Sequence, residues 1–409
     1  MRTPFSDLPR EIAVLSGVAF SVALGFGVVA PAIPLFARQF GVGLTAAGAV
    51  VSAFALMRLV SALGGGRLVD RLGERVVLAT GIGIVAVSSL LAGLAQSYVQ
   101  LLVLRGIGGV GSAMFTVSAV SLVLRVAPPQ QRGRATGLYQ GGFLVGGIAG
   151  PALGGVVTAG SARVPFFVYA ATLAVAGAIG LAFLAHTPLA EREHAQRASS
   201  GVSLRDALRT RPYRSALTVN FGTGWALFGV RSSLLPLFVV ESLHRSAVWV
   251  GVGLVASSVG QALLLLPAGR LADSVGRRPA MLLGGCLTAG ATLVLALVPH
   301  VAAYVAALVL LGVGSAFLGV APAAVVGDVA HGRSGTVVAA FGMASDFGAV
   351  IGPIAAGLIV DASSYEIAWL VTAAILGAGV LMTATMPETR HVPAPAPVLE
   401  PEGEQLAEG

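Results

Sequence analysis

The chain has 409 residues, of which 56% are hydrophobic and 11% are charged, and its mean hydropathy is +0.88. Soluble domains are about one quarter charged, so this composition indicates an integral membrane protein and excludes a large soluble domain. The formal charge of +7 comes from arginine without any lysine, which excludes a P-loop ATPase site, because that site needs a lysine for its phosphates.

Twelve apolar runs, separated by short polar breaks, predict twelve membrane-spanning helices. Each run approaches the ~20 residues that a helix needs to cross a bilayer. The runs cover residues 12–36, 44–66, 76–95, 99–124, 135–158, 165–185, 215–240, 247–267, 279–298, 302–327, 337–360 and 367–386. The predicted fold class is therefore an all-α membrane protein.

The arginines between the runs predict the topology. With both termini in the cytoplasm, nineteen arginines fall on the cytoplasmic side and three on the outer side, and cytoplasmic loops of membrane proteins carry such an excess. Since this distribution accounts for the positive charge, we expect no nucleic-acid partner. We expect an integral protein of the plasma membrane.

The longest polar connection divides the chain into two halves of six spans each. We expect an N-terminal bundle over residues 1–186, a cytoplasmic central loop over 187–212, a C-terminal bundle over 213–390 and a disordered cytoplasmic tail over 391–409. Within the loop, Ser203 is placed to cap a short helix that extends to Arg209. The tail is rich in proline and acidic residues, which is typical of disorder.

Three motifs recur at nearly constant spacing in the two halves. The segment Gly66–Asp70 returns as Gly269–Asp273 after 203 residues, Gly111–Ala113 returns after 203, and Gly150-Pro151 returns after 202. Duplicated six-span units that lie side by side create a cavity at their interface near the middle of the membrane. The repeat predicts two pseudo-symmetric six-helix bundles around such a cavity.

The first of these motifs lies in the loop between the second and third spans. Glycine permits a tight reversal, and an aspartate can bind arginines there. A single copy is explained by a solvated turn, whereas duplication favours a latch for one conformation. The proposed latch consists of Gly66, Asp70, Arg71, Gly73, Arg75, Gly269, Asp273, Gly276 and Arg277.

The fifth span carries glycines at every fourth position. Gly146, Gly150 and Gly154 form one flat helix face that lets another helix approach closely. Pro151 removes a backbone donor and bends the helix, and Gly155 is the last residue of the motif. Ordinary packing of small residues and a functional hinge remain equally good interpretations.

Four charges fall inside the spans, namely Arg58, Arg105, Arg231 and Asp346. Such charges cost about 2.5–3.5 kcal/mol each at the bilayer centre and usually face a cavity or a partner. Asp346 is the acid in this group and a candidate proton carrier, and the alternative is an ion pair with an arginine. For Arg58 and Arg231 we expect structural pairing.

Other polar and aromatic residues give weaker indications. Asp328, Asp361 and Glu366 fall at span ends, where solvation is expected. Aromatic side chains in spans often simply pack or meet lipid. The candidates for a cavity lining are Phe26, Tyr139, Phe143, Trp225, Phe228 and Phe341.

Together these motifs resemble the major facilitator superfamily, and in particular its twelve-span drug:proton antiporters. The first span carries Gly25, Pro31 and Pro34, similar to that family's first-helix motif, and residues 146–155 match its fifth-span motif. Residues 105–113 resemble its fourth-span motif, except that Gly108 stands where glutamine is common. The resemblance implies the major facilitator fold, a role for Arg105 in proton coupling, and a fifth-span face at the seam between the halves.

The favoured function is secondary transport by alternating access, most of all proton-coupled efflux of small amphiphilic organic compounds or drugs. The partners are then the bilayer, a small-molecule substrate and protons, with no cofactor or metal, and one chain suffices as a monomer. Because the embedded charges sum to +2, proton-coupled or facilitated transport of a small anionic or neutral metabolite is the alternative. Residues 332–335 have the GxSG shape of an intramembrane serine protease, but Ser334 falls in a cytoplasmic loop, so we expect no enzyme.

Overall fold

The computed structural model describes residues 9–127, 131–184, 202–330 and 335–390, and the regular elements in these ranges are helical. Twelve candidate membrane spans occur in them, which confirms the all-α fold class. The elements are α1 (Arg10–Val29), α2 (Ala32–Arg38), α3 (Leu44–Leu72), α4 (Glu74–Gly93), α5 (Tyr98–Val126), α6 (Arg132–Gly160), α7 (Val164–Leu184), α8 (Leu204–Arg209), α9 (Arg211–Thr223), η2 (Gly224–Val230), α10 (Arg231–Leu237), η3 (Phe238–Ser242), α11 (Val248–Ser274), α12 (Arg277–Leu297), α13 (Val301–Ala330), α14 (Gly335–Ala362) and α15 (Tyr365–Ala384).

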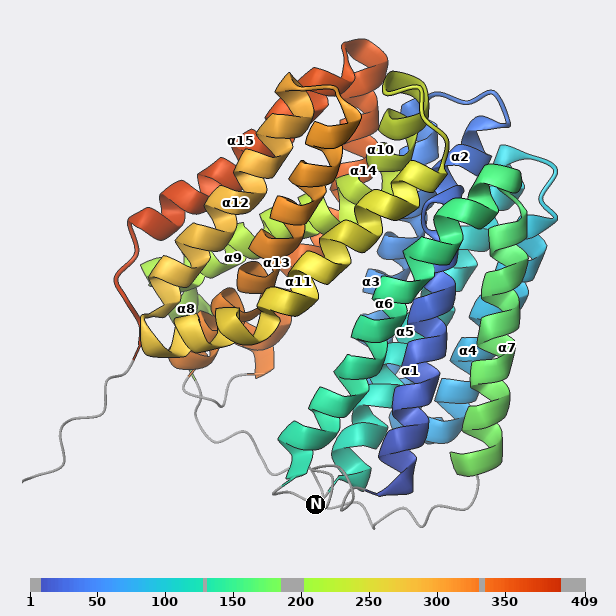
Figure 1. Cartoon of the computed structure of the whole chain (residues 1–409). Coiled ribbons are helices and arrows are strands. Elements are labelled where there is room, and N and C mark those ends of the chain that lie inside the picture. The colour runs from blue at the N-terminus through green and yellow to red at the C-terminus, as the bar shows by residue number, and fades with distance from the viewer. Residues whose placement is uncertain (1–8, 128–130, 185–201, 331–334, 391–409) are drawn as a thin grey trace, which may run out of the picture.

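The helices form two bundles that meet at one end and diverge toward the end at which α1 begins (Figure 1). Elements α1 to α7 build the first bundle, and α9 to α15 build the second. Each bundle has a buried core of its own. Large apolar side chains also cover the outside, with Leu266 75% and Leu381 70% exposed. Such an exposed apolar surface suits contact with lipid.

Two predicted spans are interrupted. The first span breaks between α1 and α2, where Pro31 precedes the second helix. The seventh span consists of α9, the π-helical turns η2 and η3, and α10 between them. π-Helical turns are rare and are frequent at functional sites.

The loop expected between the second and third spans is almost entirely helical. Helix α3 continues to Leu72, so the segment that begins at Gly66 is its last part. Gly73 alone, at φ +83°, makes the turn into α4, and Gly276, at φ +145°, has the same place before α12. Glycine is required there because other residues rarely adopt positive φ. The expected short helix after Ser203 is confirmed as α8, whose Asp206 amide donates to the Ser203 hydroxyl.

The two bundles contact each other through two seams that repeat each other. Helix α3 packs on α14 and helix α6 packs on α11. A Cβ at Gly48 of α3 would overlap the carbonyl oxygen of Pro353, and a Cβ at Gly251 of α11 would lie 2.6 Å from that of Pro151. Gly251 follows Gly48 by 203 residues and Pro353 follows Pro151 by 202. The repeat found in the sequence is therefore a repeat of the contacts between the halves.

An ion pair recurs in both halves with its charges exchanged. In the first bundle, Glu74 at the start of α4 binds Arg125 of α5 at 2.7 Å. In the second bundle, Arg277 at the start of α12 binds Asp328 of α13 at 3.3 Å. Each partner of the second pair lies 203 residues after its counterpart in the first. Glu74 is buried, and Asp328 is only partly exposed, so the expectation that Asp328 is solvated was wrong.

This exchange predicts that the first pair can also form with its charges reversed, with the arginine on α4 and the acid on α5. We expect Glu74→Gln to lower the stability of the first bundle by about 1–3 kcal/mol, because Arg125 then loses its buried partner. The double variant Glu74→Arg with Arg125→Asp should recover most of that loss. Thermal unfolding of the purified protein measures both effects, and a double variant no more stable than the single one would contradict the prediction.

Glu388 anchors the chain after the last helix to the start of α12. Its carboxylate accepts the backbone amides of Arg277 at 2.8 Å and Arg278 at 3.0 Å. Partial burial acts to raise the pKa of Glu388, but these amides, with those of Thr389 and Arg390, outweigh it and hold the pKa below its usual 4.5. The positive end of a helix also favours a negative charge.

The stabilising effect of Glu388 should therefore depend on pH. A lowered carboxyl pKa stabilises the folded protein above the ordinary pKa, and this contribution is lost as the pH falls through the folded-state value. We expect Glu388→Gln to lower the melting temperature by about 1–3 °C at pH 7 and by progressively less below pH ~4.5. Glu366→Gln, which changes an exposed acid, is the control. If Glu388→Gln lowers the melting temperature equally at pH 4 and pH 7, the stabilising role of the ionised Glu388 carboxylate is refuted.

Candidate functional site

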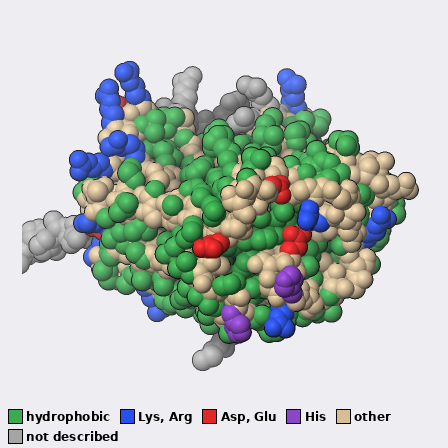
Figure 2. Space-filling model, turned by 90° about the horizontal axis from the view of Figure 1, so that it is seen from above, with side chains coloured by type: hydrophobic (Ala, Val, Ile, Leu, Met, Phe, Trp, Pro, Cys, Tyr) green, Lys and Arg blue, Asp and Glu red, His purple; other side chains and the backbone are tan. Residues whose placement is uncertain are grey.

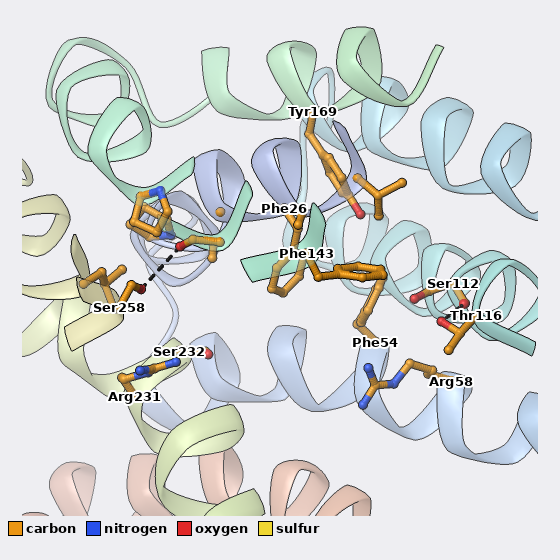
Figure 3. A pocket seen from close by; sticks show the side chains of 18 of the residues that line it. Phe26, Phe54, Arg58, Ser112, Thr116, Phe143, Tyr169, Arg231, Ser232 and Ser258 are labelled. Carbon is orange, nitrogen blue, oxygen red and sulfur yellow. Dashed lines mark hydrogen bonds between the residues drawn. The ribbon is translucent and has the colours of Figure 1, made fainter. Parts of the chain in front are cut away.

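A cavity of about 340 Å³ lies between the two bundles. Helices α1, α3, α5, α6 and α7 supply the wall on the first bundle, and α10 and α11 supply the opposite wall. Figure 3 shows aromatic rings in the middle of this space, with Arg231, Ser232 and Ser258 at one end and Arg58, Ser112 and Thr116 at the other. The cavity is therefore apolar at its centre and polar at both ends.

The embedded acid and one embedded arginine form an ion pair across the two halves. Arg58 Nη2 of α3 lies 2.9 Å from Asp346 Oδ1 of α14. Arg58 lines the cavity. The side chains of Arg58 and Asp346 are 39% and 33% exposed. The pairing predicted as the alternative for Asp346 is thus present, and it leaves both groups accessible.

Arg105 lies behind the aromatic wall. It is 3% exposed, and its guanidinium carbon sits 4.4 Å from the centre of the Phe54 ring. Phe54 in turn lines the cavity. A cation over an aromatic face is stabilised by the ring's electron density, so the Phe54 ring links Arg105 to the cavity wall.

Arg231 follows directly after the π-helical turn η2. Gly224, the first residue of η2, is pressed against the backbone of Ser345. A π turn accommodates an extra residue relative to an α-helix, which changes the direction of the residues after it. The Arg231 guanidinium lines the cavity and donates to Ser257 Oγ at 3.2 Å. Among the described residues it pairs with no acid, so the expected structural ion pair was wrong.

The predicted aromatic lining is correct at two positions out of six. Phe26 and Phe143 line the cavity. The other four lie elsewhere because helix faces cannot be assigned without knowing the neighbouring helices. Trp225 is buried and donates to Thr372, Tyr139 is buried beside Phe143, Phe228 is 57% exposed, and Phe341 packs on the second bundle's core.

Three aromatic residues of the lining were missed from the sequence. Phe54, Phe115 and Tyr169 contribute to the wall. Phe26 lies 6.2 Å from Phe54 and 6.3 Å from Tyr169, measured between ring centres. Phe54 lies four residues before Arg58, on the same face of α3, and this spacing was the available signal.

The end of the molecule opposite the start of α1, here called the distal end, holds the bundles together by polar contacts. Asp361 of α14 accepts the amides of Leu44 and Thr45 at 2.9 and 2.8 Å, and so caps α3 of the other bundle. The Thr45 hydroxyl donates to the same carboxylate. Asp361 is exposed, as expected, but its bonds across the two halves were not predicted.

A second distal contact joins Arg38, Glu241 and Tyr365. Arg38 Nε donates to Glu241 at 2.9 Å, and the Tyr365 hydroxyl donates to the other carboxylate oxygen at 2.8 Å. Arg38 and Glu241 are themselves 203 residues apart, so they occupy equivalent positions in the repeat. Viewed from this end, a few acidic and histidine side chains stand on a largely apolar surface (Figure 2).

The remaining contacts between the halves continue inward from the distal end. Ser52 donates to the carbonyl of Val350 at 2.6 Å, and Ser258 donates to that of Gly147 at 3.4 Å. Among described residues, the cross-bundle hydrogen bonds extend from the distal end to the level of the Arg58–Asp346 pair. The two halves are therefore joined on the distal side of the cavity.

One protein-family model matches the chain twice. The model described as "Major Facilitator Superfamily" matches residues 15–256 and again residues 230–408. The chain belongs to the Major Facilitator Superfamily. The double match agrees with the two bundles and with the repeated contacts between them.

Two bacterial resistance proteins are similar to this superfamily member over part of its length. The quinolone resistance protein NorA of Staphylococcus aureus (strain MRSA252) is 30% identical over 179 residues, which are 44% of this chain and 46% of NorA. Multidrug resistance protein 1 of Bacillus subtilis (strain 168) is 29% identical over 168 residues, 41% of this chain and 43% of that protein. The match therefore spans a little under half the length of these relatives.

Solved structures of two transporters share the fold over nearly the whole chain. A bacterial homolog of the human lysosomal transporter Spinster, in an inward-facing and unoccupied conformation, has a TM-score of 0.76 and 16% identity and covers 96% of this chain and 100% of its own. A mutant of the nucleoside transporter NupG has a TM-score of 0.72 and 16% identity and covers 91% and 98%. At this identity the likeness concerns the fold alone.

The fifth-span motif of this superfamily member lies differently from the expectation. Gly146, Gly150 and Gly154 face the backbone of α1, within the same bundle. The contact with the other bundle is made instead by Gly155 and by the carbonyl of Pro151, both against Gly251. The three glycines spaced by four residues lie on one face of α6, which packs on α1. Gly155 and Pro151 lie on the neighbouring face, and that face reaches the seam.

The first-helix motif of the superfamily lies beside the cavity. Gly25 allows α7 to approach, because a Cβ there would meet Tyr169 at 2.6 Å. Pro31 lines the cavity and Pro34 is buried in α2.

The latch residues are only partly within the described part of the chain. The side chain of Asp70 lies outside it, as does Ser334 of the protease-like segment. Arg71 is exposed, Arg75 lies in the first turn of α4, and Gly269 has open space around it. In the second copy, Arg277 binds Asp273 at 2.8 Å as well as Asp328, so these described contacts stay inside one bundle.

Proposed function

We propose that this superfamily member is a secondary transporter that exports small amphiphilic organic compounds in exchange for protons. The observation that carries the proposal is the Arg58–Asp346 pair, which joins the two bundles at the wall of the cavity. In this mechanism the cavity opens alternately to the two sides of the membrane as the bundles rock against each other.

The pair offers a physical link between a proton and the contact of the bundles. With Asp346 ionised, its attraction to Arg58 holds α3 against α14. When Asp346 takes up a proton, the charge and most of this attraction are lost, and the seam is weakened. A substrate in the cavity meets the same Arg58, so proton and substrate compete for one interaction, as exchange requires.

The proposed orientation places the distal end outside and both termini in the cytoplasm. It follows from the excess of arginine at the opposite end. The bundles are then closed toward the outside and the next step is opening at the distal end. A single chain encloses the cavity, so we propose a monomer driven by the proton gradient with no bound cofactor and no enzymatic activity.

The names of the two sequence relatives support export of drug-like compounds. A second candidate is transport of a small anionic or neutral metabolite. It is favoured by the lining, in which Arg58 and Arg231 are the charged side chains.

Flux into vesicles tests the proposed function. The purified full chain is reconstituted into liposomes that contain a pH indicator, and the lumen is made acidic. A panel of fluorescent amphiphiles of positive, zero and negative charge is added outside. We expect at least one compound to accumulate against its gradient while the lumen loses protons, and a protonophore to abolish this accumulation. Downhill movement that the protonophore leaves unchanged would overturn proton exchange and support the second candidate.

A further inference from the structure

The charges around the cavity do not balance. Arg58 is neutralised by Asp346 at 2.9 Å. Arg231, on the opposite wall, contacts the neutral hydroxyl of Ser257 and, among the described residues, no carboxylate. Arg105 adds another positive charge behind the Phe54 ring. A cation inside a membrane protein is costly unless a partner neutralises it, so an occupant with a negative charge is favoured.

The polar groups near Arg231 suit a planar anion. Its guanidinium has five donors in a fixed plane and can bind both oxygens of one carboxylate. Among the residues that the structure describes, Ser257 engages one of its nitrogens. Ser232 lines the same end of the cavity (Figure 3) and can donate a further hydrogen bond to an anion. Ser258 also lines this end, but its hydroxyl donates to the Gly147 carbonyl.

The centre of the cavity suits a flat aromatic body. Phe26 lies between Phe54 and Tyr169, and the planes of Phe26 and Tyr169 meet at 70°. Offset and edge-to-face contacts between rings are favourable beyond the apolar area that they bury. The volume of about 340 Å³ is at the lower end for a ligand pocket, which favours a compound of a few fused rings.

We propose that the cavity takes an aromatic carboxylate, whose anionic group binds Arg231 and whose rings lie against Phe26, Phe54 and Tyr169. This inference rests on the proposed function, for which it names the class of substrate. The cavity then selects organic anions over the matching cations, because a cation would face Arg231 without compensation. The Arg58 end, with Ser112 and Thr116, remains for a second polar group of the substrate.

Binding without any pH gradient tests this selectivity separately from transport. The probes are anthracene-2-carboxylate, its uncharged carboxamide, and the cation 2-(aminomethyl)anthracene, each followed by fluorescence on the purified full chain. We expect the carboxylate to bind about 10- to 100-fold more tightly than the carboxamide and the cation to bind weakest. Arg231→Gln should reduce carboxylate binding to that of the carboxamide and leave the carboxamide unchanged. Arg245→Gln, which removes an exposed arginine, should change neither.

Two results would overturn the proposal. One is a wild-type protein that binds the cation or the carboxamide as tightly as the carboxylate, a result that needs no variant. The other is an Arg231→Gln variant that still binds the carboxylate more tightly than the carboxamide. Unchanged carboxamide binding shows that the variant is folded. If vesicles show no proton exchange but the carboxylate preference holds, the proposed function fails and the substrate class stands. If exchange occurs with the cation alone, the substrate class fails.

Discussion

We expect Asp346→Asn to abolish accumulation against a gradient while downhill exchange of substrate continues. Asparagine keeps the size of the side chain and an oxygen that can accept from Arg58, but it can neither carry a negative charge nor take up a proton. The driving force for uphill movement is then lost completely, whereas the cavity keeps its shape. The measurement is flux of the compound identified in the vesicle test, with and without an imposed pH gradient.

The stability of the Asp346→Asn variant should change little. Both side chains of the Arg58 pair keep about a third of their exposure, and ion pairs with such exposure contribute about 1 kcal/mol or less. Glu366→Gln removes an exposed acid near the distal end of the next helix and serves as the control, with full uphill transport expected. Retention of uphill transport by Asp346→Asn would remove this residue from the mechanism and reduce the pair to a structural contact.

The fold could be predicted from the sequence because it depends on features that are local or repeated. Hydropathy alone marks the twelve spans, since lipid requires apolar runs of about 20 residues. The 203-residue repeat predicts the two bundles, and the same offset relates the exchanged pairs that begin at Glu74 and Arg277. The loop around Gly66 was misassigned because a polar segment on a helix that extends beyond the bilayer has the composition of a loop.

The charged residues of the site could be predicted because each of them is costly in itself. Arg58, Arg231 and Asp346 stand out because charges in spans need a reason. Their partners could not be predicted, since Arg58 and Asp346 are 288 residues apart. From the sequence, each of the three embedded arginines was an equally good partner for Asp346. The π-helical turn before Arg231 has no signal in a single sequence, and the direction of that side chain depends on it.

The second large effect is expected from filling the close contacts of both seams. In the double variant Gly48→Val with Gly251→Val, each new side chain meets a backbone carbonyl, that of Pro353 or that of Pro151. A backbone carbonyl within a helix cannot move aside as a flexible side chain can. Overpacking of this kind costs about 1–3 kcal/mol per site, which is roughly five- to 150-fold in the ratio of two conformations. The cost falls only on the conformation in which the distal end is closed.

We therefore expect the double variant to fold, to remain open at the distal end and to lose transport. Distances between spin labels at Gln39→Cys and Arg245→Cys, both exposed distal positions, with Cys286→Ala as background, should lengthen relative to the protein without the two valines. Gly83→Val, at a position with no heavy atom within 4 Å of the added Cβ, is the control for adding the same side chain. If the distal distance is unchanged and transport continues, these seams do not separate during the cycle. The bundles would then have to move at other contacts, because a seam that opens and closes during the cycle could not close again with a valine in its way.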